Sequence, residues 1–455
     1  MNKSEVHNYF VQNRERFLAE WREFLKFKSI STDPLYHQEC LDCATWLVTH
    51  LQSLGLKTEL LETSSKPVVY AEWQGEKTKP QVIFYGHYDV QPVDPVEAWS
   101  SDPFGGELRG DRVYARGAQD NKGQVFYYIK ALQFLMEKGA LGCSVKLFIE
   151  GEEESLSTGI AAALPTWGEK VKGDILMVCD TGMYRAGLPA ITMGLRGMVA
   201  CTATLKGPRT DLHSGVHGGV VLNPATEMAR LLSSLHHADG SIAVEGYYAD
   251  VRPASEREIK LAEQNGLDIK RYEESVGVPA VGGEHSYGPY ERRGFRPTLE
   301  INGIHSGYGG PGTKTIIPSV ATAKLSSRLA KGQNPKKALK LLSDHLMEHT
   351  PPGLTLEITD CDTGCEAVRV SPDSPIVKKA AEVLEQLGED GISYIWEGAS
   401  IPIISEFVKH SGAEPLLVGF GLEEDSIHAP NESFSLEQFE QGFLYVALFL
   451  EQVTK

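Results

Sequence analysis

Histidines and carboxylates follow the ends of several predicted strands, and these residue types bind divalent metals. Residues 82–85 are apolar, β-branched and aromatic, which is typical of a buried strand, and Gly86, His87 and Asp89 come next. In extended backbone, residues i and i+2 face the same side, so Asp89 can accept the spare N–H of His87. The other ring nitrogen is then free for a metal. A histidine beside a hydrogen-bonded neighbour is common, so this pair alone does not establish a site.

The same arrangement recurs further along the chain. The residues concerned are Asp120 in a glycine-flanked turn, Glu152, Glu153 and Glu154 after the strand predicted at 145–149, Asp180 after residues 175–179, and His428 after residues 416–419. Ligand sites in open α/β sheets form beyond the carboxyl ends of the strands. Each residue has an ordinary alternative explanation as a turn, cap or surface residue. Their joint occurrence predicts the ligands of a two-metal site.

The three consecutive glutamates cannot all have the same role. Glu153 and Glu154 project differently from the backbone, so one can bind a metal while the other stays free to accept a proton. Spacing does not decide which of the three is which. Imidazole and carboxylate ligands together suit zinc or manganese.

The composition is that of a globular protein with more than one domain. A chain of 455 residues exceeds one ordinary core, and 41% hydrophobic and 23% charged residues are usual values. The formal charge of −17 disfavours nucleic acid and anionic membranes as partners and is compatible with a site that collects cations. The start has no apolar signal region and no apolar run is long enough to span a membrane, which predicts a cytoplasmic protein.

The cysteines favour a reducing compartment. There are seven, an odd number, which fits free thiols better than a disulfide framework. Cys40 and Cys43 have a spacing that redox and zinc motifs use. They lie in a helix predicted from residue 40 to residue 54, with no second pair to complete a zinc site, so packing is the favoured interpretation.

Apolar periodicity predicts an α/β fold with a mostly parallel sheet, covered by helices on both faces and interrupted by an insertion. Strands alternate with helices before residue 190 and again after residue 366. Between them, two long strands at 191–205 and 321–329 and helices at 223–236 and 335–349 indicate a smaller α+β domain. Residues 239–296 read as loops with one short helix near 255–264. The predicted organisation is a catalytic domain formed by residues 1–190 and 367–455, with a lid or dimerisation domain at 191–366.

Five motifs together resemble a known enzyme family over nearly the whole chain. They are Gly86-His87-Tyr88-Asp89-Val90-Gln91-Pro92, Arg116-Gly117-Ala118-Gln119-Asp120-Asn121-Lys122-Gly123, Glu150-Gly151-Glu152-Glu153-Glu154-Ser155, Asp211-Leu212-His213-Ser214-Gly215 and Ile427-His428. The set is similar to the co-catalytic metallopeptidases that include carnosine-type dipeptidases, acetylornithine deacetylase and succinyl-diaminopimelate desuccinylase. The resemblance is strongest to the cytosolic non-specific dipeptidases.

The resemblance implies a role for each residue. It assigns the metal ligands to His87, Asp120, Glu154, Asp180 and His428, with Asp120 bridging two divalent ions: zinc, or alternatively manganese or cobalt. A water between the ions would attack the peptide bond of a dipeptide or short peptide. Glu153 would be the general base and Asp89 would orient the first histidine. The family also implies a cis peptide bond between Asp120 and Asn121, which is rare outside proline.

Further residues of the insertion are assigned in the same way. The resemblance implies a homodimer in which His213 stabilises the oxyanion in the neighbouring subunit's site, with His217 as a rival. Arg328 on a lid strand can bind a substrate carboxylate in bidentate fashion, or it can be an exposed strand arginine. Gly398 and Ser400 can contact the same carboxylate.

Other functions agree less well with the sequence. The glycine-rich segment 307–315 misses the phosphate-binding loop pattern by one residue, since Thr313 stands where lysine is required. The sequence holds no Gly-x-Ser-x-Gly elbow, which disfavours a serine hydrolase. A non-catalytic zinc-stabilised protein would not need an intact Glu153. The remaining alternative is an N-acyl amino acid deacylase or carboxypeptidase of the same family. In that family, aspartate at position 180 accompanies enzymes that bind a free substrate amine.

Overall fold

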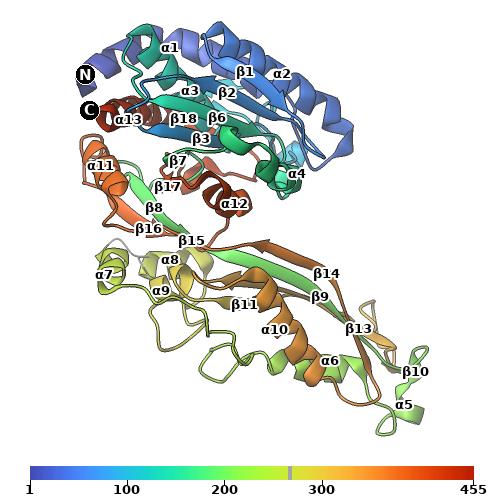
Figure 1. Cartoon of the computed structure of the whole chain (residues 1–455). Helices are drawn as coiled ribbons and strands as arrows, with labels where there is room; N and C mark the ends of the chain where they lie inside the picture. The colour runs from blue at the N-terminus through green and yellow to red at the C-terminus, as the bar shows by residue number, and fades with distance from the viewer. Residues whose placement is uncertain (265–268) are drawn as a thin grey trace. The chain divides into compact units, whose positions relative to one another are not determined.

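The computed structural model describes residues 1–264 and 269–455, which divide into two compact units (Figure 1). The first unit comprises residues 1–193, 370–395 and 406–455. The second comprises residues 194–369 and 396–405. In chain order, the second unit is therefore inserted into the first.

The first unit is built on a mixed β-sheet whose central strands are parallel. Across the sheet the order is β1 (Lys57–Leu61), β2 (Val68–Trp73), β6 (Ser144–Glu150), β3 (Gln81–His87), β7 (Ile175–Val178), β17 (Glu414–Leu417) and β8 (Ala190–Leu195). The four strands from β6 to β17 run parallel, and the outer strands are antiparallel to their neighbours. The predicted α/β fold is thereby confirmed. Two short strands, β15 (Val368–Arg369) and β16 (Ser393–Trp396), pair with β8.

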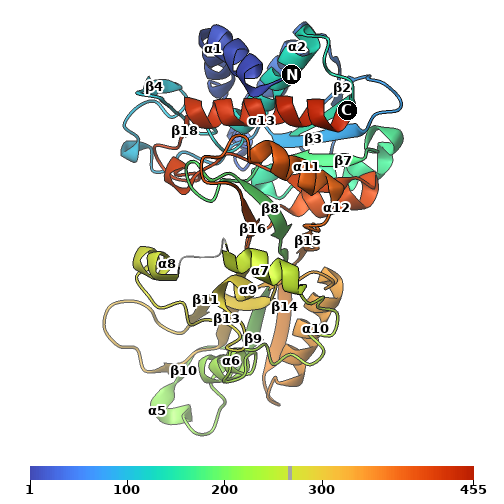
Figure 2. The same cartoon turned by 90° about the vertical axis from the view of Figure 1, so that its left-hand side faces the viewer.

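Helices cover both faces of this sheet because adjacent residues of each central strand are apolar on both sides. Phe84 of β3 packs on Tyr128 of α3 (Lys122–Glu137), with ring centroids 5.0 Å apart. Its neighbour Tyr85 packs on Phe407 of α12 (Pro402–Ser411) at 5.6 Å. The other helices of the first unit are α1 (Lys3–Leu25), α2 (His37–Ser53), α4 (Thr158–Ala163), α11 (Pro375–Leu384) and α13 (Leu436–Thr454). Figure 2 shows α13 along its length, with α11 beside it.

A small three-stranded sheet joins distant parts of the first unit. It pairs β18 (Ser433–Ser435) with β5 (Arg112–Tyr114), and β5 with β4 (Glu107–Arg109). The strands have only three residues each, too few to give a periodic sequence signal. This pairing places Glu432, the residue before β18, beside the segment that follows β5.

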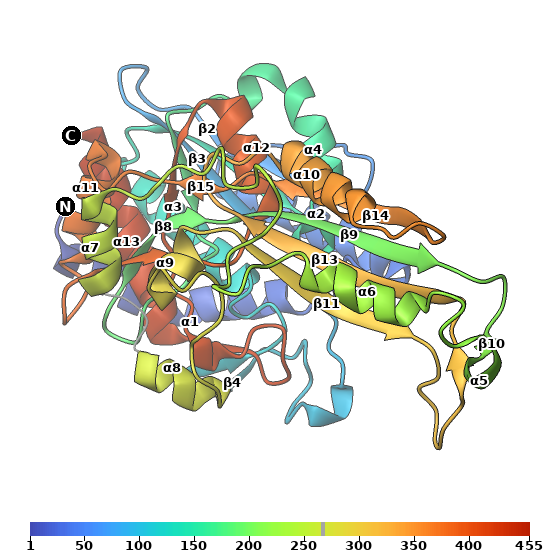
Figure 3. The same ribbon diagram turned by 90° about the horizontal axis from the view of Figure 1, so that it is seen from below.

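The second unit is an antiparallel sheet with one apolar face. Its strand order is β11 (Thr298–Ser306), β13 (Val320–Leu329), β9 (Gly197–Lys206) and β14 (Thr355–Cys365). Helices α6 (Pro224–Ser233) and α10 (Pro335–Glu348) lie across one face (Figure 3). Val199 and Leu205 are buried beneath them, whereas Thr202 is on the other, more polar face. The predicted single strand at 191–205 is in fact β8 and β9, interrupted at Arg196.

Residues 239–296 contain more helix than predicted. The expected helix is α7 (Glu256–Gln264), but α8 (Ile269–Val276) and α9 (Pro289–Gly294) follow it. The prediction was incomplete because these helices are short and glycines flank them, so loop signals dominate the sequence. Elsewhere in the second unit, β10 (Leu212–His213) pairs with β12 (Ile316–Ile317), and α5 (Ser214–His217) follows β10. Within the described residues, no helix combines the length and the apolar run needed to cross a bilayer.

Candidate metal centre

The five predicted ligands lie close together in the first unit. β3 ends at His87, and Asp180 follows the end of β7. Asp120 lies directly before the cap of α3, and Glu154 lies in a short turn after β6. Because parallel strands present their carboxyl ends at one edge of the sheet, segments far apart in sequence converge there.

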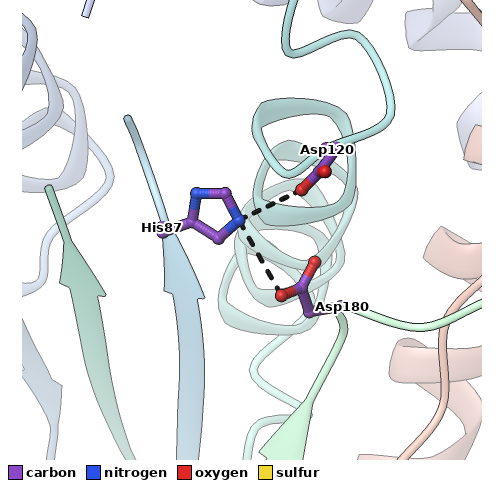
Figure 4. A group of neighbouring side chains, drawn as sticks. All are labelled: His87, Asp120 and Asp180. Carbon is purple, nitrogen blue, oxygen red and sulfur yellow. Dashed lines mark hydrogen bonds and ion pairs between the residues drawn. The ribbon is translucent and has the colours of Figure 1, made fainter. Parts of the chain in front are cut away.

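Two groups of three ligands share Asp120. In the first, His87 Nε2 is 3.2 Å from Asp120 Oδ1 and 3.8 Å from Asp180 Oδ2 (Figure 4). In the second, His428 Nε2 is 2.9 Å from Asp120 Oδ2 and 3.4 Å from Glu154 Oε1. One carboxylate with an oxygen directed at each group is the arrangement expected of a bridging ligand.

The electrostatics of this cluster fit divalent cations. Burial, together with the negative charges of Asp120 and Glu154, raises the pKa of Asp180 to about 7. Burial likewise raises the pKa of Glu154. Glu154 Oε1 is buried and has no hydrogen-bond partner among the described residues. Buried carboxylates facing one another need a compensating positive charge, and imidazole and carboxylate are ligands that zinc and manganese accept.

Asp89 connects the two halves of the cluster. His87 Nδ1 lies 3.0 Å from the backbone carbonyl oxygen of Asp89 and 3.3 Å from its Oδ1. The Asp89 carboxylate accepts hydrogen bonds from the backbone N–H groups of Glu153, at 3.2 Å, and Glu154, at 3.0 Å. The predicted contact with His87 is therefore present. Asp89 also fastens the glutamate turn to the end of β3, which the sequence did not indicate.

Asn121 is a supporting residue that sequence reasoning missed. Its Nδ2 donates to Asp180 Oδ1 at 2.7 Å and to the Cys179 carbonyl oxygen at 2.9 Å. Its Oδ1 accepts from the backbone N–H of His87 at 3.3 Å. The Asp120–Asn121 peptide bond is cis, which confirms the expectation from the resemblance. Asn121 thus orients two candidate ligands, which lie at the ends of the neighbouring strands β3 and β7. In the sequence, only its place next to Asp120 in the motif pointed to this role.

Glu432 fixes the loop that carries Asp120. Its carboxylate is fully buried and accepts hydrogen bonds from the backbone N–H groups of Gly117, Gln119 and Asp120, each at 3.0 Å. It also forms an ion pair with Arg116 at 2.7 Å. No local pattern marks this residue, because its partners are more than 300 positions away.

We expect Glu432→Gln to lower the free energy of unfolding by about 3 kcal/mol. The substitution leaves the Arg116 guanidinium buried without its counter-ion, and removing one partner of a buried pair is strongly destabilising. Urea denaturation monitored by circular dichroism measures the change. Glu424→Gln is the matched control, since Glu424 is 69% exposed and lies 3.7 Å from Arg112. Equal stability of the two variants would show that Glu432 does not hold the loop.

Glu153 lies beside the ligands but belongs to neither group of three. It begins the short turn Glu153–Ser155, and its side chain is partly buried. Burial raises its pKa well above the usual range, and the negative charges of Asp180 and Glu154 add to the effect. A carboxylate with a raised pKa and no ligand contact is suited to accept and return a proton.

The other predicted residues are in the second unit. His213 is exposed at the end of β10, and its Nδ1 accepts a hydrogen bond from the Gly215 N–H at 3.0 Å. Its rival His217 ends α5 and is less exposed. Arg328 on β13 donates to Ser400 Oγ at 2.7 Å, and the Gly398 carbonyl oxygen accepts from Arg196 Nε at 3.0 Å. The structure brings Arg328, Ser400 and Gly398 into one cluster within this unit.

The chain is similar to several metallopeptidases over its whole length. It is 26% identical to Cys-Gly metallodipeptidase dug1 of Schizosaccharomyces pombe, covering all of this chain and 98% of that protein. It is 28% identical to the human Beta-Ala-His dipeptidase, covering 98% of this chain and 92% of the other.

The chain is also similar to solved structures of peptidases. The M20 family metallo-carboxypeptidase Sso-CP2 from Sulfolobus solfataricus superposes with a TM-score of 0.86 at 32% identity, over 96% of this chain and 99% of the other. Human carnosine dipeptidase 1 gives a TM-score of 0.80 at 27% identity, over all of this chain and 99% of the other. The family model described as peptidase family M20/M25/M40 matches residues 83–452. The chain belongs to peptidase family M20/M25/M40.

Proposed function

We propose that the protein hydrolyses the peptide bond of dipeptides or short peptides, using two divalent metal ions and Glu153 as the general base. The observation that carries this proposal is the pair of ligand groups that share Asp120, with the uncoordinated Glu153 carboxylate beside them. Relatives named as Cys-Gly and Beta-Ala-His dipeptidases support the substrate class. Aspartate at position 180 agrees with a substrate that has a free amine.

The residues of the cluster would have different roles. His87, Asp120 and Asp180 would hold one ion, and Asp120, Glu154 and His428 the other; zinc fits, and manganese and cobalt are alternatives. When bound, such ions lower the pKa of water toward neutrality and polarise a carbonyl group. Glu153 would take a proton from the attacking water and return it to the leaving nitrogen. Asp89 would keep both His87 and the Glu153 turn in position.

The second unit would complete the site as a lid in a homodimer. Its main segment, residues 194–369, overlaps the insertion expected at 191–366, and residues 396–405, expected in the catalytic domain, also belong to it. Because His213 Nδ1 accepts a hydrogen bond from Gly215, the ring proton of the neutral histidine is on Nε2. That N–H can donate to an oxyanion, which favours His213 for the role over His217. Its exposure agrees with action on the neighbouring subunit.

Arg328, with Gly398 and Ser400 beside it, would bind the carboxylate of the substrate. Arg328 offers a planar guanidinium group for bidentate contact, and Ser400 Oγ accepts a hydrogen bond from this group at 2.7 Å.

All seven cysteines are free and, apart from Cys361, buried, which agrees with a cytoplasmic enzyme.

Metal removal combined with a substrate panel tests this function. Dialysis against a chelator should abolish hydrolysis of Cys-Gly and β-Ala-His, and zinc, manganese or cobalt should restore it. The reconstituted enzyme should cleave free dipeptides at least about tenfold faster than their N-acetylated forms, because the site would recognise the substrate amine. Metal content is measured in parallel by mass spectrometry.

Two outcomes of that experiment count against the proposal. Activity that persists after verified metal removal would refute a metal-dependent reaction. Preference for the N-acetylated forms would instead support a deacylase or carboxypeptidase. Of these two activities, carboxypeptidase is the one named for the structure from Sulfolobus solfataricus.

A further inference from the structure

Arg196 is a partly buried arginine whose side-chain hydrogen-bond partners, in the part of the chain that the structure describes, are all neutral oxygens. Its Nε donates to the Gly398 carbonyl oxygen at 3.0 Å, and its Nη1 lies 3.3 Å from Thr298 Oγ1 and 3.5 Å from the Arg296 carbonyl oxygen. Burial lowers the pKa of Arg196 to about 10, and the positive charge of nearby Arg328 contributes, while the negative charge of Glu300 opposes the shift. Within residues 1–264 and 269–455, neither Arg196 nor Arg328 has a carboxylate within 4.0 Å. Two partly buried positive charges close together favour an anion beside them.

The backbone of Arg196 also fixes the segment that contacts Arg328. The Arg196 N–H donates to the Ala399 carbonyl oxygen at 3.1 Å. The Ser400 hydroxyl donates to the Arg196 carbonyl oxygen at 2.5 Å and accepts from Arg328 Nη1 at 2.7 Å. A serine hydroxyl has one proton, so Ser400 has none left for a substrate carboxylate in this arrangement. Arg196 therefore fixes the Ser400 hydroxyl, and Ser400 in turn fixes the guanidinium of Arg328.

We propose that Arg196 is a positioning residue that makes the enzyme specific for substrates with a free terminal carboxylate. It holds residues 398–400 from both its side chain and its backbone, and through Ser400 it fixes the guanidinium of Arg328. This inference rests on the proposed function, because it concerns the carboxylate of the same substrate.

The test compares a dipeptide with its C-terminal amide. Arg196→Met should raise the KM for the best dipeptide of the panel at least about tenfold, and should lower its kcat less. The ratio of kcat/KM between dipeptide and amide should fall by about the same factor, because the amide lacks the charge that Arg328 attracts. Arg196→Lys keeps a side-chain donor for the Gly398 carbonyl oxygen and should recover part of the ratio. Lys324→Met is the matched control, since it removes an exposed positive charge from the same strand as Arg328.

A double variant separates positioning from independent binding. If Arg196 acts through Arg328, adding Arg196→Met to Arg328→Met should lower the ratio little further, because interacting residues are not additive. Losses that multiply, or equal losses on dipeptide and amide, would overturn the proposal. If Arg196→Met fails to fold, Thr298→Val replaces it, because this variant removes the hydroxyl that Arg196 Nη1 contacts at 3.3 Å. A wild-type enzyme that cleaves no dipeptide would instead refute the proposed function.

Discussion

Replacing Glu153 by glutamine is expected to lower kcat about a thousandfold while both metal ions still bind. Glutamine has nearly the shape of glutamate but cannot accept a proton at neutral pH. Glu153 belongs to neither ligand group, so its substitution removes no metal contact. Its backbone N–H would still donate to Asp89, which keeps the turn in place. Stopped assays at high enzyme concentration measure the residual rate, and mass spectrometry measures the metal content.

Glu154→Gln is the matched comparison, one residue further along the same turn. Glu154 Oε1 is 3.4 Å from His428 Nε2 and belongs to the second ligand group. This variant should lose about one metal ion per chain, because an amide oxygen is a weaker ligand than a carboxylate. If Glu153→Gln lost metal while Glu154→Gln lost only turnover, the two roles would be reversed.

Much of the candidate metal centre could be predicted because its signals are local. An apolar run followed within two residues by a histidine or carboxylate marks a strand end, and His87 and Asp180 both have this context. The predicted parallel sheet then places these strand ends close together, since parallel strands bring their carboxyl ends to one edge of the sheet. The His87–Asp89 contact was also predictable, because it depends only on a spacing of two residues in extended backbone.

What could not be predicted depends on contacts between distant segments. Glu432 holds the Asp120 loop from a position 312 residues away, and in the sequence it is an unremarkable glutamate between two polar residues. The direction of the glutamate turn depends on Leu156 and Ser157, which have positive φ angles of 81° and 52°. Non-glycine residues rarely adopt such angles, so no residue preference reveals them. Arg196 likewise looked like one residue of a single long strand.

Two inactive variants are expected to restore activity to each other when they form a mixed dimer. His213→Ala removes the proposed oxyanion donor, and Glu153→Gln removes the general base. The second unit has two edge strands, β11 and β14, and exposed edges are normally covered or paired. If His213 serves the neighbouring subunit, one site of each mixed dimer has both an intact Glu153 and an intact His213.

Co-expression with two different affinity tags isolates the mixed dimer by sequential purification. Each purified mixed dimer should show about half the activity of the wild type, because one of its two sites is complete. The tagged parent dimers, purified in the same way, give the background, and His217→Ala in place of His213→Ala tests the rival histidine. Were His213 to act within its own subunit, both sites of the mixed dimer would lack one group. A purified mixed dimer without recovered activity would therefore refute the shared site, and a protein that is monomeric in solution would refute its premise.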